Sequence, residues 1–321
     1  AAGLMHDVIE DTNISRNEMV EKFGKEVADL VEGVSKLSGI KFSSRREKQA
    51  ENFMKMFLSV AKDLRVIIIK FADRLHNMST IKHLPLIKQR RIAIETRDVY
   101  APLAHRLGMN KLKIELEDLI LKTLEPEEYK LLHKKTKASR KQREKYIEEF
   151  ATPIKIEIKN FNIDAQIFGR AKHYFSISGK MKKQNKKYEE LFDLFAIRII
   201  VDKIDKCYAI LGIVHQLYTP LQERFKDYIA TPKSNGYQSI HTTVFGYKGR
   251  MVEVQIRTRE MDQTAESGVA AHWLYKEKGS IKLDNSKIDR HMRWLRELVE
   301  VLQAEDSNPE EFLKLLKVDL F

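Results

Sequence analysis

Two short stretches in the last third of the chain carry polar side chains at the spacing of β-strands. Their alternate positions read Tyr237, Ser239, His241 and Thr243, and then Glu253, Gln255 and Arg257. Alternate residues of a strand share one face, and the glycine-bearing turn at 246–249 between the stretches is a hairpin signal. One face of the hairpin would therefore gather Tyr, His, Glu, Gln and Arg side chains. Such a set suits the floor of a pocket, with a solvated outer face as the alternative.

A second stretch, residues 169–180, supplies side chains that suit phosphate groups. They are Arg170, Lys172, Ser176 and Lys180, and the last three recur at i,i+4 spacing. On a helix this spacing makes one basic stripe with a hydroxyl in its middle. Lysine offers phosphate a point charge and arginine offers it a fork of donors. The glycine-rich GxxxxGK[ST] pattern is absent from the sequence.

An acidic residue, Asp193, precedes an apolar strand signal at 195–201 that carries Arg198. Mg²⁺ prefers one or two carboxylates together with phosphate oxygens. Asp193 and Glu253 are therefore candidates to hold Mg²⁺ together.

The N-terminal end carries a third cluster, in which His6 and Glu10, and Asp7 and Asp11, stand at i,i+4 spacing. On a helix this places a histidine and three carboxylates in a small volume, which a divalent cation would neutralise. Histidine with carboxylates suits Mn²⁺, Fe²⁺ or Zn²⁺, and an exposed helix N-terminus is the alternative.

Asp73 and Asn77 repeat the i,i+4 spacing within another helical segment, next to His76. We expect His76 to pack or to support a ligand rather than to bind metal itself. A metal held by these two helical segments would activate water for attack on a phosphate ester.

Composition limits the possible partners and compartments. The chain has 321 residues and a formal net charge of +12, which predicts an anionic partner, either nucleic acid or phosphorylated small molecules. Its single cysteine, Cys207, excludes a disulfide framework and fits a reducing cytosol. It has no run of 18 apolar residues and no signal peptide, so we expect a cytoplasmic protein without a membrane span. Because it begins Ala-Ala-Gly within an apolar helical pattern, we expect an N-terminal truncation.

The apolar patterning divides the chain into four ranges. Residues 1–125 read as helices throughout, 126–150 as a charged helical connector, and 281–321 as amphipathic helix. Residues 151–280 predict an α+β domain built on a mostly antiparallel sheet. Its strand signals fall at 154–163, 195–201, 237–246 and 251–258.

The N-terminal motifs, HDxxED from His6 and ADRLHNM at 72–78, resemble the HD-type hydrolase domain of the long RelA/SpoT homologue family. Members of that family make and break the alarmone (p)ppGpp. The roles that the resemblance implies are Mn²⁺ binding for His6, Asp7 and Asp73, water activation for Glu10 and Asp11, and a substrate contact for Asn77. It also places a further metal-binding histidine, and an arginine that packs on guanine, upstream of Ala1. We therefore expect impaired hydrolysis.

The later motifs resemble the (p)ppGpp synthetase domain of the same family. They are RxKxxxSIxxK from Arg170, DxxAxRI from Asp193, KDYIxxPKxNGYQSxH from Lys226, ExQIRT from Glu253 and AExGVAAHW from Ala265. In order, they extend the resemblance over essentially the whole chain. The implied fold is multidomain, α and α+β: an all-helical HD-type hydrolase domain, then a nucleotidyltransferase-like synthetase domain with a mixed sheet. The helices at 281–321 would lead to regulatory domains.

The resemblance implies transfer of pyrophosphate from ATP to the 3′-hydroxyl of GDP or GTP. It assigns Mg²⁺ to Asp193 and Glu253, with Glu253 also accepting the proton of the 3′-hydroxyl. The ATP side would use Arg170 and Arg198 on adenine and Lys172, Ser176 and Lys180 on phosphates. The acceptor side would use Tyr237 on guanine, with Lys233, Asn235, Gln238 and His241 around it. Lys226, Gln255 and Arg257 complete the nucleotide-binding set.

Two further positions refine this expectation. Arg224-Phe-Lys226-Asp227 has the RxKD form of bifunctional family members, and Asp262 stands where the family usually has histidine. The alternatives are a fragment with one activity only and, from another class, a basic nucleic-acid-binding module, whose binding would fall steeply with salt. In the family, contacts with the ribosome and uncharged tRNA come largely from C-terminal domains that this sequence does not include.

Overall fold

The computed structural model describes residues 1–35, 63, 65–170, 172–188, 195–233, 235–268 and 270. The described residues form two compact units. The first includes residues from 1–85 and 98–103, and the second includes residues from 86–97 and 104–271.

The regular secondary structure described in the first unit is all helical. Its helices are α1 (Val8–Asp11), α2 (Arg16–Phe23), α3 (Lys25–Ser35) and α5 (Arg65–Ser79), followed by the 3₁₀ turn η1 (Ile81–His83). Helix α2 begins with a capping box, in which Ser15 accepts from the backbone of Glu18 and the Glu18 carboxylate accepts from the backbone of Ser15. A small core of Met19, Ala28, Val31, Val34 and Val66 joins α2, α3 and α5. The expected all-helical N-terminal domain is confirmed for these residues.

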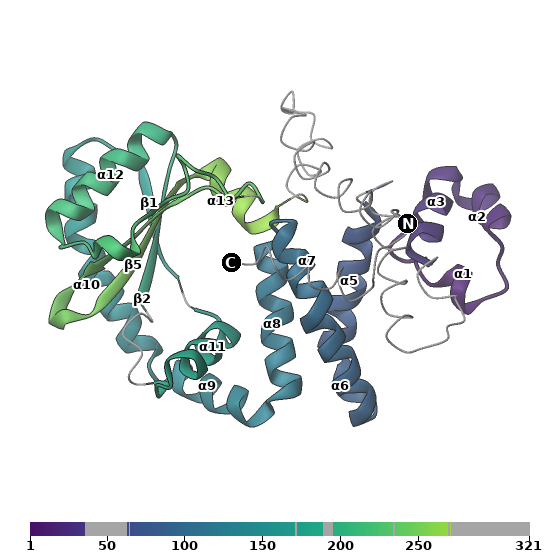
Figure 1. Ribbon diagram of the computed structural model, residues 1–321. Coiled ribbons are helices and arrows are strands. Elements are labelled where there is room, and N and C mark those ends of the chain that lie inside the picture. The colour runs from purple at the N-terminus through teal and green to yellow at the C-terminus, as the bar shows by residue number, and fades with distance from the viewer. Residues whose placement is uncertain are drawn as a thin grey trace, which may run out of the picture. The chain divides into compact units, whose positions relative to one another are not determined.

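The second unit places helices around one five-stranded sheet (Figure 1). Its main helices are α6 (Leu86–Glu95), α8 (Asn110–Leu124), α9 (Pro126–Ala138), α10 (Arg140–Asn160), α11 (Tyr174–Gln184), α12 (Ile204–Leu217) and α13 (Arg259–Ser267). The π-helical turn η2 (Thr96–Tyr100) and α7 (Ala101–Arg106) follow α6. Residues 98–103 of this segment belong to the first unit, and its other residues belong to the second. The short turns η4 (Gln222–Arg224) and η5 (Tyr247–Gly249) lie between strands.

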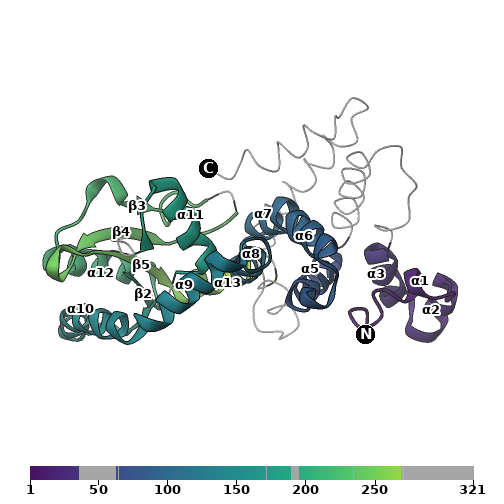
Figure 2. The same ribbon diagram turned by 90° about the horizontal axis from the view of Figure 1, so that it is seen from below.

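The sheet runs in the order β1-β2-β5-β4-β3, and Figure 2 shows β2, β5, β4 and β3 in that sequence. Its strands are β1 (Ala165–Gly169), β2 (Phe195–Val201), β3 (Lys226–Asp227), β4 (Ile240–Phe245) and β5 (Met251–Thr258). Only β2 and β5 pair in parallel, and the other neighbouring strands are antiparallel. The expected mixed, mostly antiparallel sheet is confirmed.

One face of the sheet is apolar and covered by α10 and α12 (Figure 1). Alternate residues of β2, β4 and β5 point to this face and are fully buried, as strand geometry requires. They include Ile197, Ile199, Ile240, Val244, Val254 and Ile256. Burial of this layer is the main stabilising contribution to the unit, at about 25 cal/mol per Å² of apolar surface.

The prediction of a strand at 154–163 is wrong, because α10 continues to Asn160. Ile154, Ile156 and Ile158 alternate with charged residues and so resemble a strand pattern, yet Ile156 is exposed. The buried residues of α10 recur every four positions, at Tyr146, Phe150, Ile154 and Ile158. Helical periodicity across the whole of α10 therefore overrides the local alternation.

The predicted hairpin is confirmed, although its first strand begins at Ile240 rather than Tyr237. Antiparallel pairing sets His241 opposite Gln255 and Thr243 opposite Glu253. The turn needs a positive φ at Gly249 (66°), a conformation that glycine adopts readily. A polar row crosses the second face of the sheet at this level, through Arg198, Gln255, His241 and Lys226, with Phe168 paired to Arg198 at its β1 end.

Candidate functional site

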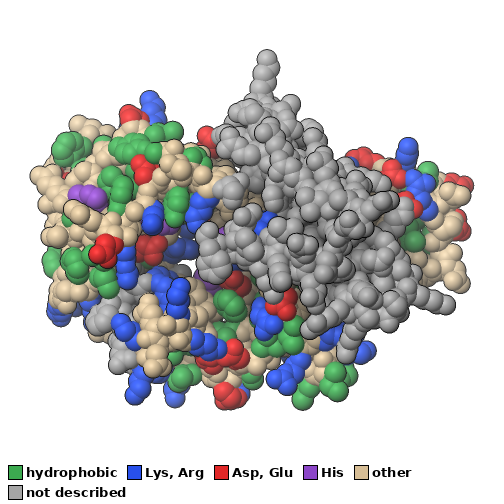
Figure 3. All heavy atoms as spheres, in the orientation of Figure 1, with side chains coloured by type: hydrophobic (Ala, Val, Ile, Leu, Met, Phe, Trp, Pro, Cys, Tyr) green, Lys and Arg blue, Asp and Glu red, His purple; other side chains and the backbone are tan. Residues whose placement is uncertain are grey.

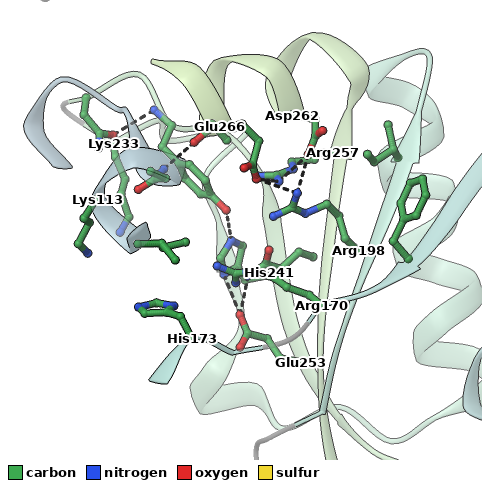
Figure 4. Close-up of a pocket in the computed structure, with 18 of the residues that line it drawn as sticks. Lys113, Arg170, His173, Arg198, Lys233, His241, Glu253, Arg257, Asp262 and Glu266 are labelled. Atoms are coloured by element: carbon green, nitrogen blue, oxygen red, sulfur yellow. Dashed lines mark hydrogen bonds and ion pairs between the residues drawn. The ribbon is translucent and has the colours of Figure 1, made fainter. Parts of the chain in front are cut away.

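A cavity of about 760 Å³ opens on the polar face of the sheet, within the second unit. Several residues expected to bind nucleotide line it together: Arg170, Arg198, Lys233, Asn235, Tyr237, His241, Glu253, Gln255 and Arg257. Figure 4 labels six of them, and their side chains converge from the sheet and the loops beside it: Arg170, Arg198, Lys233, His241, Glu253 and Arg257. The alternative of a solvated outer face is therefore wrong for this face.

Tyr237, His241 and Glu253 form a chain of polar contacts along the floor of the cavity. The Tyr237 hydroxyl lies 2.8 Å from His241 Nε2, and His241 Nδ1 lies 3.7 Å from Glu253 Oε1. Gln255 Nε2 donates a hydrogen bond to the same Glu253 oxygen at 2.7 Å. The carboxylate is thus held from two sides while part of it stays accessible.

Charge and burial set the protonation of this chain. Burial lowers the pKa of His241 to about 4, with nearby arginines and Lys233 acting in the same direction, so the imidazole is neutral at pH 7. Burial alone would raise the pKa of Glu253, but Lys172, with Nζ 3.7 Å from Glu253 Oε2, and the bond from Gln255 hold it below its ordinary value. Glu253 is therefore an ionised carboxylate that can accept a proton.

The opposite wall of the cavity comes from α7 and α8 and was not expected from the sequence. His105, Asn110 and Lys113 line this wall. The Asn235 side chain donates to the His105 carbonyl at 3.0 Å, which ties the NGYQS loop to α7. Burial lowers the pKa of Lys233, and the positive charge of nearby Lys113 lowers it further. No short motif surrounds Lys113, so only the tertiary fold reveals its place.

Burial, aided by Lys113 and Lys233, also lowers the pKa of His105 from 6.5 to about 4. An unfolded chain takes up a proton at this residue near pH 6.5, whereas the folded protein does not do so until about pH 4. Stability should therefore fall as the pH is lowered from 6.5 to 4. We expect His105→Gln to remove about 2 kcal/mol of that loss, since one pKa unit corresponds to about 1.4 kcal/mol. Urea unfolding of both proteins at pH 7.5 and 4.5 measures the difference, and equal losses would contradict the burial of a neutral His105.

Two arginines and two acids form a compact network at another side of the cavity. Asp262 Oδ1 lies 3.1 Å from Arg198 Nη1 and 2.6 Å from Arg257 Nη2. Glu266 Oε1 lies 2.8 Å and 3.5 Å from the same two nitrogens. Asp262 and Glu266 are one turn apart on α13, whose first turn is capped by the Thr258 hydroxyl at the end of β5. The motif AExGVAAHW contains Glu266, and Asp262 lies just before it, but the sequence does not indicate these contacts.

Other predicted residues lie elsewhere. Lys172, Ser176, Lys180, Lys226 and Gln238 do not line the cavity, although Lys172 reaches it through Glu253. Asp193 lies outside the described residues.

The prediction of a single basic stripe on one helix is wrong, because α11 begins at Tyr174 and Lys172 precedes it. Two acidic residues of α8 contact the residues at which α11 begins. Glu117 lies 3.2 Å from His173 Nε2, and the Asp118 carboxylate accepts the Phe175 N–H at 2.9 Å.

The first unit brings His6, Asp7 and Asp73 together. His6 Nε2 lies 2.9 Å from Asp7 Oδ2 and 3.5 Å from Asp73 Oδ1. His6 Nδ1 lies 2.9 Å from the Gly3 carbonyl, which can only accept, so Nδ1 carries the proton. A divalent cation held by Nε2 and the two carboxylates would neutralise their charge, so the donor set fits a metal.

The remaining N-terminal predictions have mixed outcomes. Asn77 Nδ2 donates to Asp73 Oδ1 at 2.8 Å, as the i,i+4 spacing predicts. However, α1 begins at Val8, so His6 precedes the helix and the expected helical pairing of His6 with Glu10 is wrong. Glu10 and Asp11 are exposed on α1. In the described part of the chain, no group of three or more His, Cys, Asp and Glu side chains has the arrangement of a complete metal site.

Comparison with known families finds two domain models along the chain. Residues 1–110 match the HD domain, and residues 169–280 match the region found in RelA / SpoT proteins. Fold and site thus define a protein with an HD domain followed by a sheet domain of the RelA/SpoT type. Both types of domain imply the use of divalent metal ions.

Similar proteins place the chain more closely. The bifunctional (p)ppGpp synthase/hydrolase SpoT of Escherichia coli (strain K12) is 47% identical over 320 residues, which cover 100% of this chain and 45% of that protein. The GTP pyrophosphokinase of Myxococcus xanthus is 48% identical over 322 residues, which cover 99% of this chain and 42% of that protein. The chain is similar to these RelA/SpoT proteins over nearly its whole length, and it spans less than half the length of these two relatives.

Among solved structures, the small alarmone synthetase 1 from Bacillus subtilis bound to its product pppGpp aligns with 54% of this chain and 95% of that chain, at 22% identity and a TM-score of 0.34. None of the helices in the described ranges combines the length and the apolar character that a membrane crossing requires.

Proposed function

We propose that the cavity of the second unit transfers pyrophosphate from ATP to the 3′-hydroxyl of GDP or GTP. The observation that carries this proposal is the Tyr237–His241–Glu253 chain on the cavity floor, with an aromatic ring at one end and an ionised carboxylate at the other. Lys172, Lys113 and Lys233 supply positive charge around it. A nucleotide whose base stacks on Tyr237 would carry its ribose towards Glu253.

The chemistry needs a base and a charged cradle, and this chain supplies both. Glu253 accepts the proton of the 3′-hydroxyl as that oxygen forms a bond to the β-phosphorus of ATP. The bond between the β-phosphorus and the oxygen bridging it to the α-phosphate breaks, and AMP leaves with the electron pair. Neutral His241 orients Glu253 and the Tyr237 hydroxyl, while the lysines stabilise charge on the transferred phosphates.

Glu253 is also the residue of the described cavity that we assign to Mg²⁺, with Asp193 as its expected partner. A carboxylate with one loosely paired oxygen, 3.7 Å from Lys172 Nζ, fits an ion that keeps most of its ligands as water and phosphate oxygens. When bound, Mg²⁺ would neutralise phosphate charge.

The test is a transfer assay with ATP, GDP or GTP, and Mg²⁺, in which AMP and a 3′-pyrophosphorylated guanosine nucleotide are quantified together. We expect the two products in equal amounts and only when both nucleotides are present. AMP without a guanosine product would contradict transfer, because it would indicate simple hydrolysis of ATP.

A second activity, Mn²⁺-dependent hydrolysis of (p)ppGpp to GDP or GTP and pyrophosphate, is proposed for the first unit. The approach of His6 Nε2 to Asp7 and Asp73 supports it, because a histidine with two carboxylates is a donor set that suits a divalent cation. Glu10 and Asp11 are the residues that we propose to activate the attacking water.

We expect Asp73→Asn to weaken Mn²⁺ binding by more than about 100-fold, because even an outer-sphere partner contributes about 10- to 100-fold. Titration of Mn²⁺ followed by electron paramagnetic resonance measures this. The matched control is Asp29→Asn, which removes a carboxylate that pairs instead with Arg16 on the same unit. Equal affinities for all three proteins would contradict the metal assignment.

We further infer that ATP, GDP or GTP, and (p)ppGpp are the partners of this chain, and that it acts in the cytoplasm, where these nucleotides are made and used. Contacts with the ribosome and tRNA are expected to need regions beyond this sequence. A nucleic-acid-binding module is less favoured, since Figure 3 shows Lys and Arg side chains interspersed with acidic ones on the visible part of the second unit rather than in one continuous track.

A further inference from the structure

The charged side chains of the cavity are unevenly divided. Two guanidinium groups, Arg198 and Arg257, meet two carboxylates, Asp262 and Glu266, so this side is electrically neutral. Figure 4 shows these four side chains turned towards one another, with Lys113 and Lys233 on another side of the cavity. We call the four residues the arginine–acid network.

The remaining charged side chains give the rest of the cavity a net positive charge. Lys113, Arg170 and Lys233 line this part, and Glu253 is the acid among them. Glu253 is itself paired with Lys172, whose side chain is only 7% exposed. A phosphate chain would therefore find its counter-charges here rather than at the arginine–acid network.

The geometry of the network favours a flat, uncharged ligand group. Each acid uses a single oxygen to bridge both guanidinium groups. Arg257 is 1% exposed and so depends on these acids for compensation of its charge. The neighbouring Arg198 is partly exposed, and a guanidinium held at Nη1 by both acids can still offer its planar face to a purine ring.

We propose that Asp262 is a positioning residue that makes Arg198 a platform for the purine base of ATP and prevents it from acting as a phosphate ligand. The cavity would then orient ATP by charge: the base lies at the neutral arginine–acid network and the phosphates lie towards Lys172, beside Glu253. The identity of the nucleotide rests on the proposed function, whereas the division of charge rests on the ion pairs alone.

The residue type at position 262 is the decisive feature. The resemblance to long RelA/SpoT homologues leads us to expect histidine there, and a neutral histidine would leave the two guanidinium groups with Glu266 alone. With aspartate the network pairs two guanidinium groups with two carboxylates. The aspartate thus strengthens the separation between a base end and a phosphate end.

The test compares two partial ligands that each report on one end of the cavity: adenosine, which has a base and no phosphate, and inorganic tripolyphosphate, which has only the phosphates. Calorimetric titration without divalent cations measures the Kd of both ligands and of ATP. Asp262→Asn is compared with the wild type and with Glu260→Gln, which makes the same charge change on the exposed side of α13.

We expect Asp262→Asn to bind tripolyphosphate about fivefold to tenfold more tightly, because one unit of negative charge is removed within several ångströms of the site. Adenosine should bind about threefold more weakly, because Arg198 is no longer held flat. Glu260→Gln should leave both constants within about twofold of the wild type. Asp262→Glu keeps the charge and should restore both constants.

Opposite shifts for the two ligands would not arise from a general loss of structure. If Asp262→Asn weakened both ligands equally, or left tripolyphosphate unchanged, the proposal would be overturned. Should that variant fail to fold, Asp262→His supplies the same comparison by pH, with tripolyphosphate expected to bind more tightly at pH 6 than at pH 8 by a larger factor than in the wild type. A wild type that binds neither ATP nor tripolyphosphate would instead contradict the proposed function.

Discussion

Replacing Glu253 with glutamine is expected to reduce pyrophosphate transfer by at least about 1000-fold. Glutamine keeps the size of the side chain but cannot accept the proton of the 3′-hydroxyl. It also removes the negative charge that compensates Lys172 and that we assign to Mg²⁺. The expected loss combines a general base, worth about 100- to 10,000-fold, with part of a metal site.

Binding measurements separate this loss from misfolding. GDP should still bind Glu253→Gln with a Kd within about threefold of the wild-type value, because Tyr237 and Lys233 are unchanged. Thr243→Ser, at the position paired with Glu253 across the hairpin, is the matched control and should keep most of the activity. A Glu253→Gln variant with more than a tenth of wild-type activity would show that Glu253 is not the base.

Replacing Gly268 with alanine is expected to destabilise the second unit by more than about 3 kcal/mol. Gly268 ends α13 with a φ of 53°, and a Cβ there would lie 2.1 Å from the Leu107 carbonyl oxygen and 2.4 Å from the carbonyl carbon of Gly108. These are backbone atoms, so no side-chain rotation relieves the overlap. The same junction is held by a hydrogen bond from Asn110 Nδ2 to the Ala265 carbonyl at 2.7 Å.

The matched control is Gly212→Ala, in the interior of α12. A Cβ there meets nothing within 4 Å, and alanine is the better helix former by about 1 kcal/mol. Urea unfolding should therefore show a lower midpoint for Gly268→Ala and an unchanged or higher one for Gly212→Ala. Equal midpoints for wild type and Gly268→Ala would mean that α13 is not docked closely against the α7–α8 turn.

The sequence predicts the hairpin and its polar face because a strand has a strict period of two. Once β4 and β5 are located, the positions of His241, Glu253 and Gln255 on one face follow without further information. The period is less informative at 154–163, where a few alternating isoleucines resemble a strand but belong to a helix whose buried positions begin eight residues earlier, at Tyr146.

The parts of the site that the sequence does not reveal depend on contacts between distant segments. Lys113 enters the cavity only because α8 packs near the sheet, and no local pattern around it encodes that. Asp262 and Glu266 have helical spacing, yet their partners lie on two different strands. Such cross-element ion pairs depend on the angle between α13 and the sheet, which local spacing does not fix.

The central claim is that one cavity on the sheet of the second unit moves a pyrophosphate group as a whole. Incubation of the protein with Mg²⁺, GDP and ATP labelled in its β-phosphate tests it most directly. We predict that the label appears in a guanosine nucleotide that resists periodate, because its 3′-hydroxyl is blocked, with AMP unlabelled. Label found in ADP would instead indicate transfer of the γ-phosphate alone, and label found only in inorganic phosphate or pyrophosphate would indicate hydrolysis; either result would contradict the claim.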